Sequence, residues 1–180
     1  TFTNNGTLSV TAGTMNLSAT TFNQPGTINL ATGSTFTRTG GFVNAGSITG
    51  SGTLNLGTGT LINNGTLTPG GSLATGTLNI TGNLVNGATG TVNAEIGGVV
   101  PGAQYDVIAV SGTATVGGTL NGSLISGFAP TSVQNFDIIT GASVLGSFST
   151  SNLPAGFNGA VVGGVYRLNQ SGVFCIGICW

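Results

Sequence analysis

The chain has 180 residues, enough for one domain, yet only 3% of them are charged and the net charge at neutral pH is −1. Its two arginines cannot form the basic surface that nucleic acid or anionic lipid requires, so we expect neither as a partner. The hydrophobic fraction of 39% separates the chain from disordered ones, and no stretch approaches the roughly 20 apolar residues of a membrane-spanning helix.

The N-terminal half returns to the same residue types about every twenty residues. The segment "TFTNNGTLSV" at 1–10 is followed by "TFNQPGTINL" at 21–30 and "GFVNAGSITG" at 41–50. An aromatic or aliphatic residue recurs at Phe2, Phe22, Phe42, Leu61 and Leu84. An amide recurs two residues later, at Asn4, Gln24, Asn44, Asn63 and Asn86. A glycine, a hydroxyl residue and an aliphatic residue follow each amide.

Each period holds three short segments that alternate between polar and apolar residues. In "GTLNL", for example, Leu54 and Leu56 lie on one side of a strand, and Thr53 and Asn55 lie on the other. A period of this length is typical of a solenoid whose coils cannot bury a core alone. The sequence therefore predicts an all-β parallel β-helix with coils of about 20 residues, right-handed as is usual for coils of this length.

Stacked coils place like residues on like residues. We expect the aromatic and aliphatic series to form an internal column that suits offset aromatic stacking, and the amides to form a ladder at a corner of the coil. Glycines fall between the strand segments, where we expect corners with positive φ.

We expect one solenoid in three parts: repeat coils over 1–95, further coils and a C-terminal capping region over 96–160, and a terminal strand with an apolar tail over 161–180. Cys175 and Cys179 lie in this tail. A straight strand would hold them too far apart for a disulfide, so they pair within the chain only if Gly177 folds the segment, and otherwise pair between chains.

The second half of the chain carries a more particular pattern. It runs through Tyr105-Asp106, Ser111 to Ala114, Gly117 to Leu120, Gly127 to Pro130, Phe136 to Ile139 and Gly146 to Phe148. This pattern resembles the C-terminal part of the β-helical passenger regions of bacterial autotransporters and filamentous-haemagglutinin-type adhesins. The resemblance covers about residues 76–158 well, and it implies a solenoid fold and a surface location.

The sequence offers little catalytic chemistry. Without histidine there can be no Ser-His-Asp arrangement, and we expect no cofactor or metal. Asp106 and Asp137 are the acidic pair that a β-helical polysaccharide-active enzyme could use, whereas in a structural protein Asp106 would cap a turn and Asp137 would face solvent. A rank of outward hydroxyls at Thr7, Thr27, Ser47 and Thr66 leaves an ice-binding protein as another alternative.

The function that we predict is that of a non-enzymatic, extracellular or bacterial cell-surface structural or adhesive protein, a rigid stalk or filament subunit. A glycan or another ligand on a cell surface is the expected partner. Thr1 already lies inside a repeat, as in a processed chain or a fragment. Open strand edges in the first coil and the apolar tail 173–180 also predict head-to-tail self-association.

Overall fold

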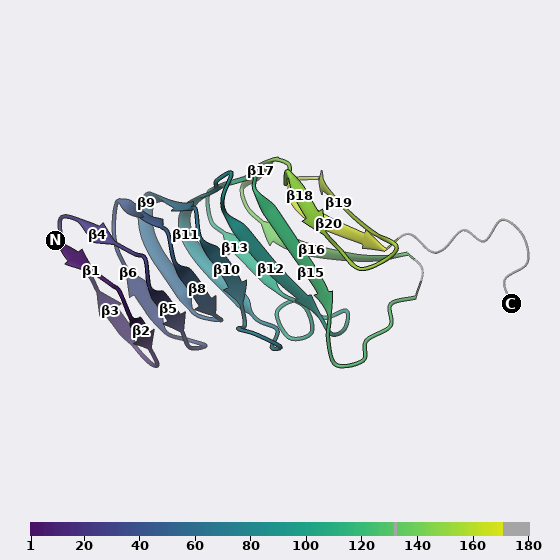
Figure 1. The fold of residues 1–180 in the computed structure, drawn as a ribbon, viewed down its shortest axis with the longest axis horizontal. Helices are drawn as coiled ribbons and strands as arrows, with labels where there is room; N and C mark the ends of the chain where they lie inside the picture. Colours follow the sequence, from purple (N-terminus) through teal and green to yellow (C-terminus); the bar gives the residue numbers. More distant parts are fainter. Residues whose placement is uncertain (132, 171–180) are drawn as a thin grey trace, which may run out of the picture.

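The computed structural model describes residues 1–131 and 133–170, and strands are the only regular elements in that part of the chain. Short strands wind into successive coils that stack along one axis, beginning with the N-terminal coil (Figure 1). Strands of neighbouring coils pair in parallel, for example Thr7 to Val10 with Thr27 to Leu30. The predicted all-β fold of stacked parallel strands is confirmed.

One side of the solenoid is a seven-stranded parallel sheet. Its strands, in spatial order, are β2 (Thr7–Val10), β5 (Thr27–Leu30), β8 (Ser47–Gly50), β10 (Thr66–Pro69), β12 (Thr91–Ile96), β15 (Thr119–Leu124) and β18 (Thr150–Asn152). Alternate residues are buried, such as Ile28 and Leu30 in β5, because Thr and Asn alternate with aliphatic residues along each strand. The seven-stranded sheet thus turns a polar face outward.

An eleven-stranded sheet covers the other two sides. Its main path contains β3 (Thr14–Asn16), β6 (Thr35–Thr37), β9 (Thr53–Asn63), β11 (Thr77–Asn86), β13 (Val107–Val110), β16 (Gln134–Thr140), β20 (Val165–Gln170) and β19 (Phe157–Val162). The third side adds β7 (Gly41–Asn44), β14 (Thr113–Val116) and β17 (Ser143–Gly146), and in the first two coils a separate pair, β1 (Phe2–Thr3) and β4 (Phe22–Asn23). Strand β9 spans two sides, because residues 53–55 pair with β6 and residues 60–63 pair with β7.

The coils become longer along the chain. The side chains of Asn4 and Gln24, one coil apart, are separated by 20 residues, whereas Asn121 and Asn152 are separated by 31. Most of the additional residues form loops at one corner, between β10 and β11, between β12 and β13, and between β15 and β16 (Figure 1). The expected period of about 20 residues therefore describes the first coils, while insertions at this corner lengthen the later ones.

Close approach explains the repeated glycines better than backbone conformation does. The expected positive φ occurs at other glycines between strands, such as Gly13 and Gly33, but at none of Gly26, Gly46 and Gly65. A Cβ at Gly46 would overlap the carbonyl oxygen of Gly26, and a Cβ at Gly65 would overlap that of Gly46. These carbonyls accept hydrogen bonds from the next coil, as in Ser47 N to Gly26 O at 2.9 Å. Glycine is needed here because the backbones of successive coils touch at the corner.

The last part of the described chain is an antiparallel hairpin. Strands β19 and β20 pair around Gly163 and Gly164, which both have positive φ, and β20 pairs antiparallel with β16. A two-residue turn of this kind matches the twist of a hairpin. Strand β20 lies within the region 161–180, and its partner β19 crosses the boundary expected at residue 161. Cys175 and Cys179 lie outside the described residues.

Candidate binding face and internal ladders

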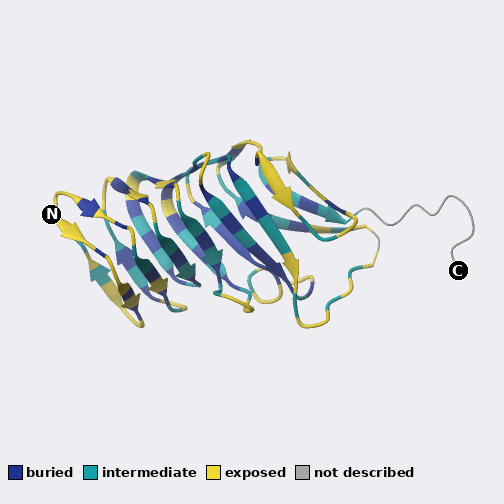
Figure 2. Ribbon diagram, in the orientation of Figure 1, coloured by how far each residue is buried: buried dark blue, intermediate teal, exposed yellow. Residues whose placement is uncertain are grey.

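The aromatic and aliphatic series lies in one column on the third side of the solenoid. Phe2 pairs with Phe22, Phe42 pairs with Leu61, and Leu61 pairs with Leu84. All are buried except Phe2, which is 38% exposed in the first coil (Figure 2). The rings do not stack in the parallel, offset manner that we expected: the centroids of Phe22 and Phe42 are 5.0 Å apart at an interplanar angle of 61°.

A residue from another strand explains this tilt. The fully buried Phe36 of β6 lies 5.9 Å from Phe22 and 6.4 Å from Phe42, between centroids. Edge-to-face packing lets a third ring contact both members of the column. The core of the first coils is therefore an aromatic cluster rather than a simple stack.

The amide series forms a buried ladder beside that column, hereafter the inner ladder. The Nδ2 of Asn44 donates to Oδ1 of Asn63 at 2.8 Å, and Nδ2 of Asn63 donates to Oδ1 of Asn86 at 2.7 Å. Asn63 also donates to the carbonyl of Gly65. At the end of the inner ladder, Asn86 donates to the carbonyl of Gly117. The amides thus satisfy each other and give corner carbonyls a second donor: the carbonyl of Gly65, for example, accepts both from Asn63 and from the backbone N–H of Thr91.

The inner ladder is interrupted where glutamine replaces asparagine. Gln24 accepts from Nδ2 of Asn4 at 2.8 Å but donates to the carbonyl of Gly26. The Oδ1 of Asn44, which is fully buried, has no hydrogen-bond partner. Gln24 therefore does not donate to Asn44, and the step from coil two to coil three lacks the side-chain bond that joins the other coils of the inner ladder.

The outward face of the seven-stranded sheet carries two parallel ranks of uncharged polar residues. The first rank consists of hydroxyl residues in register: Thr7, Thr27, Ser47, Thr66, Thr91, Thr119 and Thr150. The second rank lies two residues further along each strand and includes Ser9, Asn29, Thr49, Thr68, Asn93, Asn121 and Asn152. We call this surface the polar face.

Part of the second rank is a second amide ladder that the sequence analysis missed. Asn152 donates to Asn121 at 2.8 Å, Asn121 donates to Asn93 at 3.0 Å, and Asn93 donates to the hydroxyl of Thr68. Each of these asparagines stands two residues after a rank-one threonine, a signal that an alignment of the later coils could have revealed. We call this series of Asn93, Asn121 and Asn152 the outer ladder. Each of its amides keeps a second N–H and a second lone pair, so the outer ladder presents fixed donors and acceptors.

The acidic residues do not form a catalytic pair on an open surface. Asp106 is 1% exposed and accepts hydrogen bonds from the backbone N–H groups of Gly76 and Glu95, both within 2.9 Å. Burial raises the pKa of Asp106 to about 7, although these N–H groups oppose the rise. Asp137 on β16 accepts two hydrogen bonds from Arg167 on β20. Each carboxylate therefore has a structural partner.

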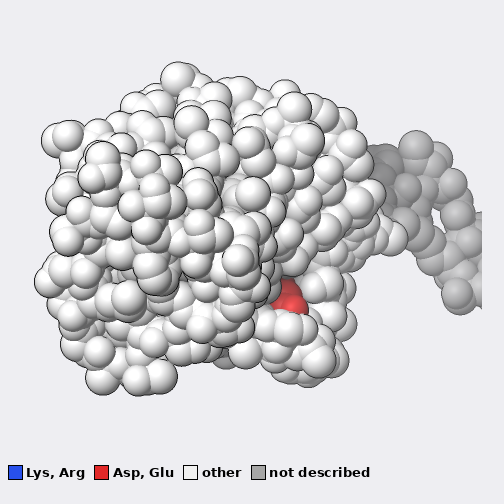
Figure 3. All heavy atoms as spheres, turned by 60° about the vertical axis from the view of Figure 1, so that its left-hand side comes forward, with Lys and Arg blue, Asp and Glu red and all other residues white. Residues whose placement is uncertain are grey.

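Charge is scarce elsewhere too. Arg38 donates to the backbone carbonyls of Thr39 and Thr20. Figure 3 shows a face on which the described residues display no basic atoms, and one small acidic area lies in a hollow. Among residues 1–131 and 133–170, no group of three or more potential metal-ligating side chains could hold an ion, and no helix is long and apolar enough to cross a membrane.

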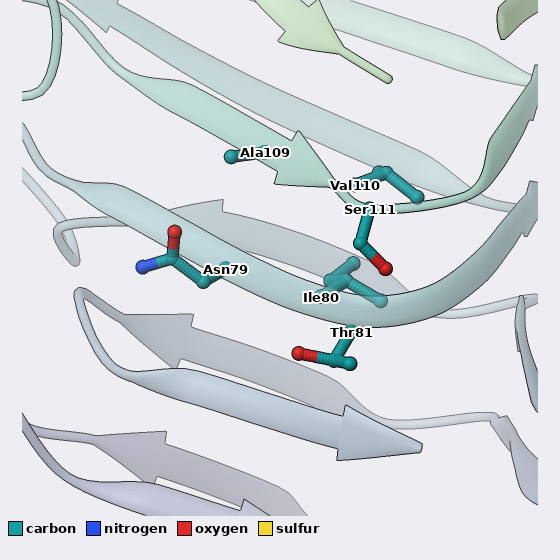
Figure 4. Close-up of a pocket in the computed structure, with 6 residues that line it drawn as sticks. All are labelled: Asn79, Ile80, Thr81, Ala109, Val110 and Ser111. Carbon is teal, nitrogen blue, oxygen red and sulfur yellow. The ribbon is translucent and has the colours of Figure 1, made fainter. Parts of the chain in front are cut away.

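Two shallow grooves mark the outside of the solenoid. One, of about 230 Å³, is lined by Asn79, Ile80 and Thr81 of β11 and by Ala109, Val110 and Ser111 of the next coil (Figure 4). The other, of about 410 Å³, is lined by Phe22, Asn23, Gln24, Pro25, Val43 and Ala45. No ionisable side chain lines either groove, so neither has a group suited to acid–base chemistry.

Comparison with known proteins gives one family. Residues 3–88 match the Haemagglutinin repeat. No curated protein and no solved structure matches the chain. The match covers the coils with the 20-residue repeat and overlaps the segment of closer resemblance, 76–158, only at its beginning. Residues 3–88, slightly less than half of the chain, are therefore similar to the haemagglutinin repeat.

Proposed function

We propose that the chain is a non-enzymatic segment of a secreted or cell-surface adhesin, in which the solenoid is a rigid stalk and the polar face binds a ligand. Haemagglutinin-repeat proteins are secreted or surface adhesins, and their repeat segments are generally non-catalytic. The observation that carries the proposal is the in-register stacking of like residues through successive coils, both inside and on the polar face. Such a body resists bending because each coil is bonded to the next along three sides.

The chemistry of the polar face favours a neutral glycan as the ligand. Hydroxyl and amide groups supply donors and acceptors without charge, which suits a polyhydroxylated chain and gives no attraction to an anionic polymer. The outer ladder adds rigidity, because each of its amides is already fixed by a neighbour.

The test is a glycan-binding screen together with a polysaccharide-cleavage assay. The double variant Thr91→Val/Thr119→Val removes two outward hydroxyls but keeps branched side chains in β12 and β15, and should weaken binding about tenfold. The control Thr35→Val/Thr53→Val makes the same change on the eleven-stranded sheet and should bind normally. Cleavage of any polysaccharide would favour the enzyme alternative. An equal loss of glycan binding in both double variants would exclude the polar face as the binding site.

A specific observation keeps an ice-binding function as the second candidate. The hydroxyl rank continues through the described coils, from Thr7 to Thr150. The second rank, however, is Asn in its later half, and these amides bond to one another. Thermal hysteresis in a solution of the protein would support ice binding, and its absence would exclude it.

We also propose that subunits associate head to tail. Each of β1, β2 and β3 pairs with one strand only in the described chain, so their other edges have free backbone groups. The proposed partner segment, 173–180, lies outside the described residues. Sedimentation of the full chain and of a form ending at residue 170 tests the idea: assembly that is unchanged by the truncation, or no assembly at all, would contradict it.

A further inference from the structure

Two buried carboxylates fasten a loop of one coil to the next coil. The loop 70–76 connects β10 to β11, and the following coil contributes Glu95 at the end of β12 and Asp106 just before β13. The two oxygens of Glu95 accept the N–H groups of Leu73 and Ala74, each at 2.8 Å. Those of Asp106 accept the N–H groups of Gly76 and Glu95. All four carboxylate oxygens are thus occupied by backbone donors.

These contacts hold the exposed middle of the loop, whose ends are also held by backbone bonds from Gly70 N to Gly50 O and from Val107 N to Gly76 O. Leu73 is 78% exposed and has a φ of 60°, a conformation that costs energy for a residue with a side chain. Its N–H group and that of Ala74 both bond to Glu95. The hydroxyl of Thr75 adds a bond to the carbonyl of Ala103 in the neighbouring loop. The carboxylates therefore fix a strained loop conformation against the body of the solenoid.

No cation balances the pair. The sequence has no lysine or histidine, Arg167 is bound to Asp137, and Arg38 is bound to carbonyls of the early coils. The loop 70–76 itself contains no ionisable residue, and the charge that acts on Asp106 is that of Glu95. Glu95 is 8% exposed, so two acidic groups lie together away from solvent with only peptide dipoles to stabilise their charge.

Ionisation and hydrogen bonding oppose one another at Asp106. Both of its oxygens accept N–H groups, which is the arrangement of a carboxylate. Burial favours the neutral acid instead and raises the pKa to about 7. A neutral carboxyl is a weaker acceptor, and its protonated oxygen loses most of its capacity to accept. Proton uptake must therefore weaken the bonds to Gly76 and Glu95.

We propose that Glu95 and Asp106 form a proton-sensitive latch, which holds the loop 70–76 firmly when Asp106 is ionised and loosens it when Asp106 binds a proton. The latch acts through the Gly76 N–H group, the single loop donor to Asp106 among the bonds described. It is independent of the ligand on the polar face.

The test follows the backbone amides by NMR across a pH titration of the full chain, from about pH 5 to about pH 9. The Gly76 and Glu95 amide shifts should move together in one step with a midpoint near 7, and the Asp106 carboxyl carbon should titrate in the same step. In Asp106→Asn, whose amide imitates the neutral acid, both amides should keep their low-pH positions throughout. Asp137→Asn removes a carboxylate elsewhere and should leave the step unchanged.

Three results would overturn the latch. They are Gly76 and Glu95 amides that do not move over this range, an amide step that persists in Asp106→Asn, and an Asp106 carboxyl carbon that titrates without any change at Gly76. The carbon titration uses the unaltered chain, so the proposal stays open to refutation if Asp106→Asn does not fold.

Discussion

The early coils and the later coils build the same three sides from different sequences. In the early coils like residues face each other: Phe2 pairs with Phe22, and the side chain of Asn44 donates a hydrogen bond to that of Asn63. The backbone of Gly46 also approaches that of Gly26 in the coil before. In the later coils the core column continues as Leu84, Ala114 and Val144, while Asn86 is the last amide of the inner ladder. The register between coils is therefore maintained by strand pairing and by the alternation of polar and apolar residues. It does not require identical residues at equivalent positions.

The core of the early coils should be the most sensitive part. Phe22→Ala removes a ring that packs against Phe2, Phe36 and Phe42, and should lower the free energy of unfolding by about 3–5 kcal/mol. Phe2→Ala changes the partly exposed end of the same column and should cost clearly less. Chemical denaturation measures both, and a loss below about 1 kcal/mol for Phe22→Ala would mean that the column contributes little to stability.

The pH dependence of stability should come from the later coils. The pKa of Asp106 is raised from 3.8 to about 7 in the folded chain, so folding favours the protonated acid. Stability should be highest below pH 3.8 for this group and fall as the pH rises towards about 7, by as much as about 4 kcal/mol.

A chain that is more stable at low pH is compatible with a latch that loosens at low pH. Protonation of Asp106 weakens its hydrogen bonds to the loop, but it also removes the larger free-energy cost of burying a charge. Denaturation curves across the pH range check the prediction. Asp106→Asn should flatten the dependence, whereas a chain that becomes more stable as the pH rises through this interval would contradict it.

The inner ladder should matter more than the outer ladder. Asn63→Ala leaves the Oδ1 of Asn86 without its donor, and a buried polar group left unpaired costs about 1–3 kcal/mol. The Nδ2 of Asn44 loses its side-chain acceptor but keeps its bonds to the carbonyls of Gly46 and Thr66. Asn121→Ala breaks two bonds of the outer ladder, where water can replace them, and should cost below about 1 kcal/mol. Equal losses in thermal or chemical unfolding would show that burial does not separate the ladders.

The glycine corner gives another matched pair of variants. Gly46→Ala forces a methyl group into the backbone of the previous coil and should cost about 1–3 kcal/mol. Gly6→Ala changes the same repeat position in the first coil, where a Cβ meets nothing within 4 Å, and should be nearly neutral. Similar stabilities for the two variants would mean that the corner can shift to accept a side chain.

The sequence alone was sufficient for the features that repeat. Alternation and the 20-residue period predicted strands, coils and the positions that share a column, because equivalent positions of successive coils lie directly above one another in a solenoid. The hairpin β19–β20 was less visible, although Gly163-Gly164 between two β-prone segments is a recognisable turn signal.

The carboxylate pair could not be read from the sequence in the same way. Glu95 ends the alternating segment "TVNAEI", and nothing local indicates that its partners are backbone groups of a loop more than twenty residues earlier. Asp106 has the same difficulty, since its contact with Gly76 depends on how two loops of unequal length meet. The ring tilt at Phe22 also depends on Phe36, which belongs to a different column.

The longest loops of the later coils, 70–76, 97–106 and 125–133, leave the solenoid at the corner between the seven-stranded sheet and the strand that follows it. Closing a longer loop costs little additional entropy, and strand pairing on either side does not depend on its length. This corner is therefore a natural insertion point. Foreign peptides or whole modules inserted there, one per coil, would form a line along the solenoid without changing the pairing of its strands.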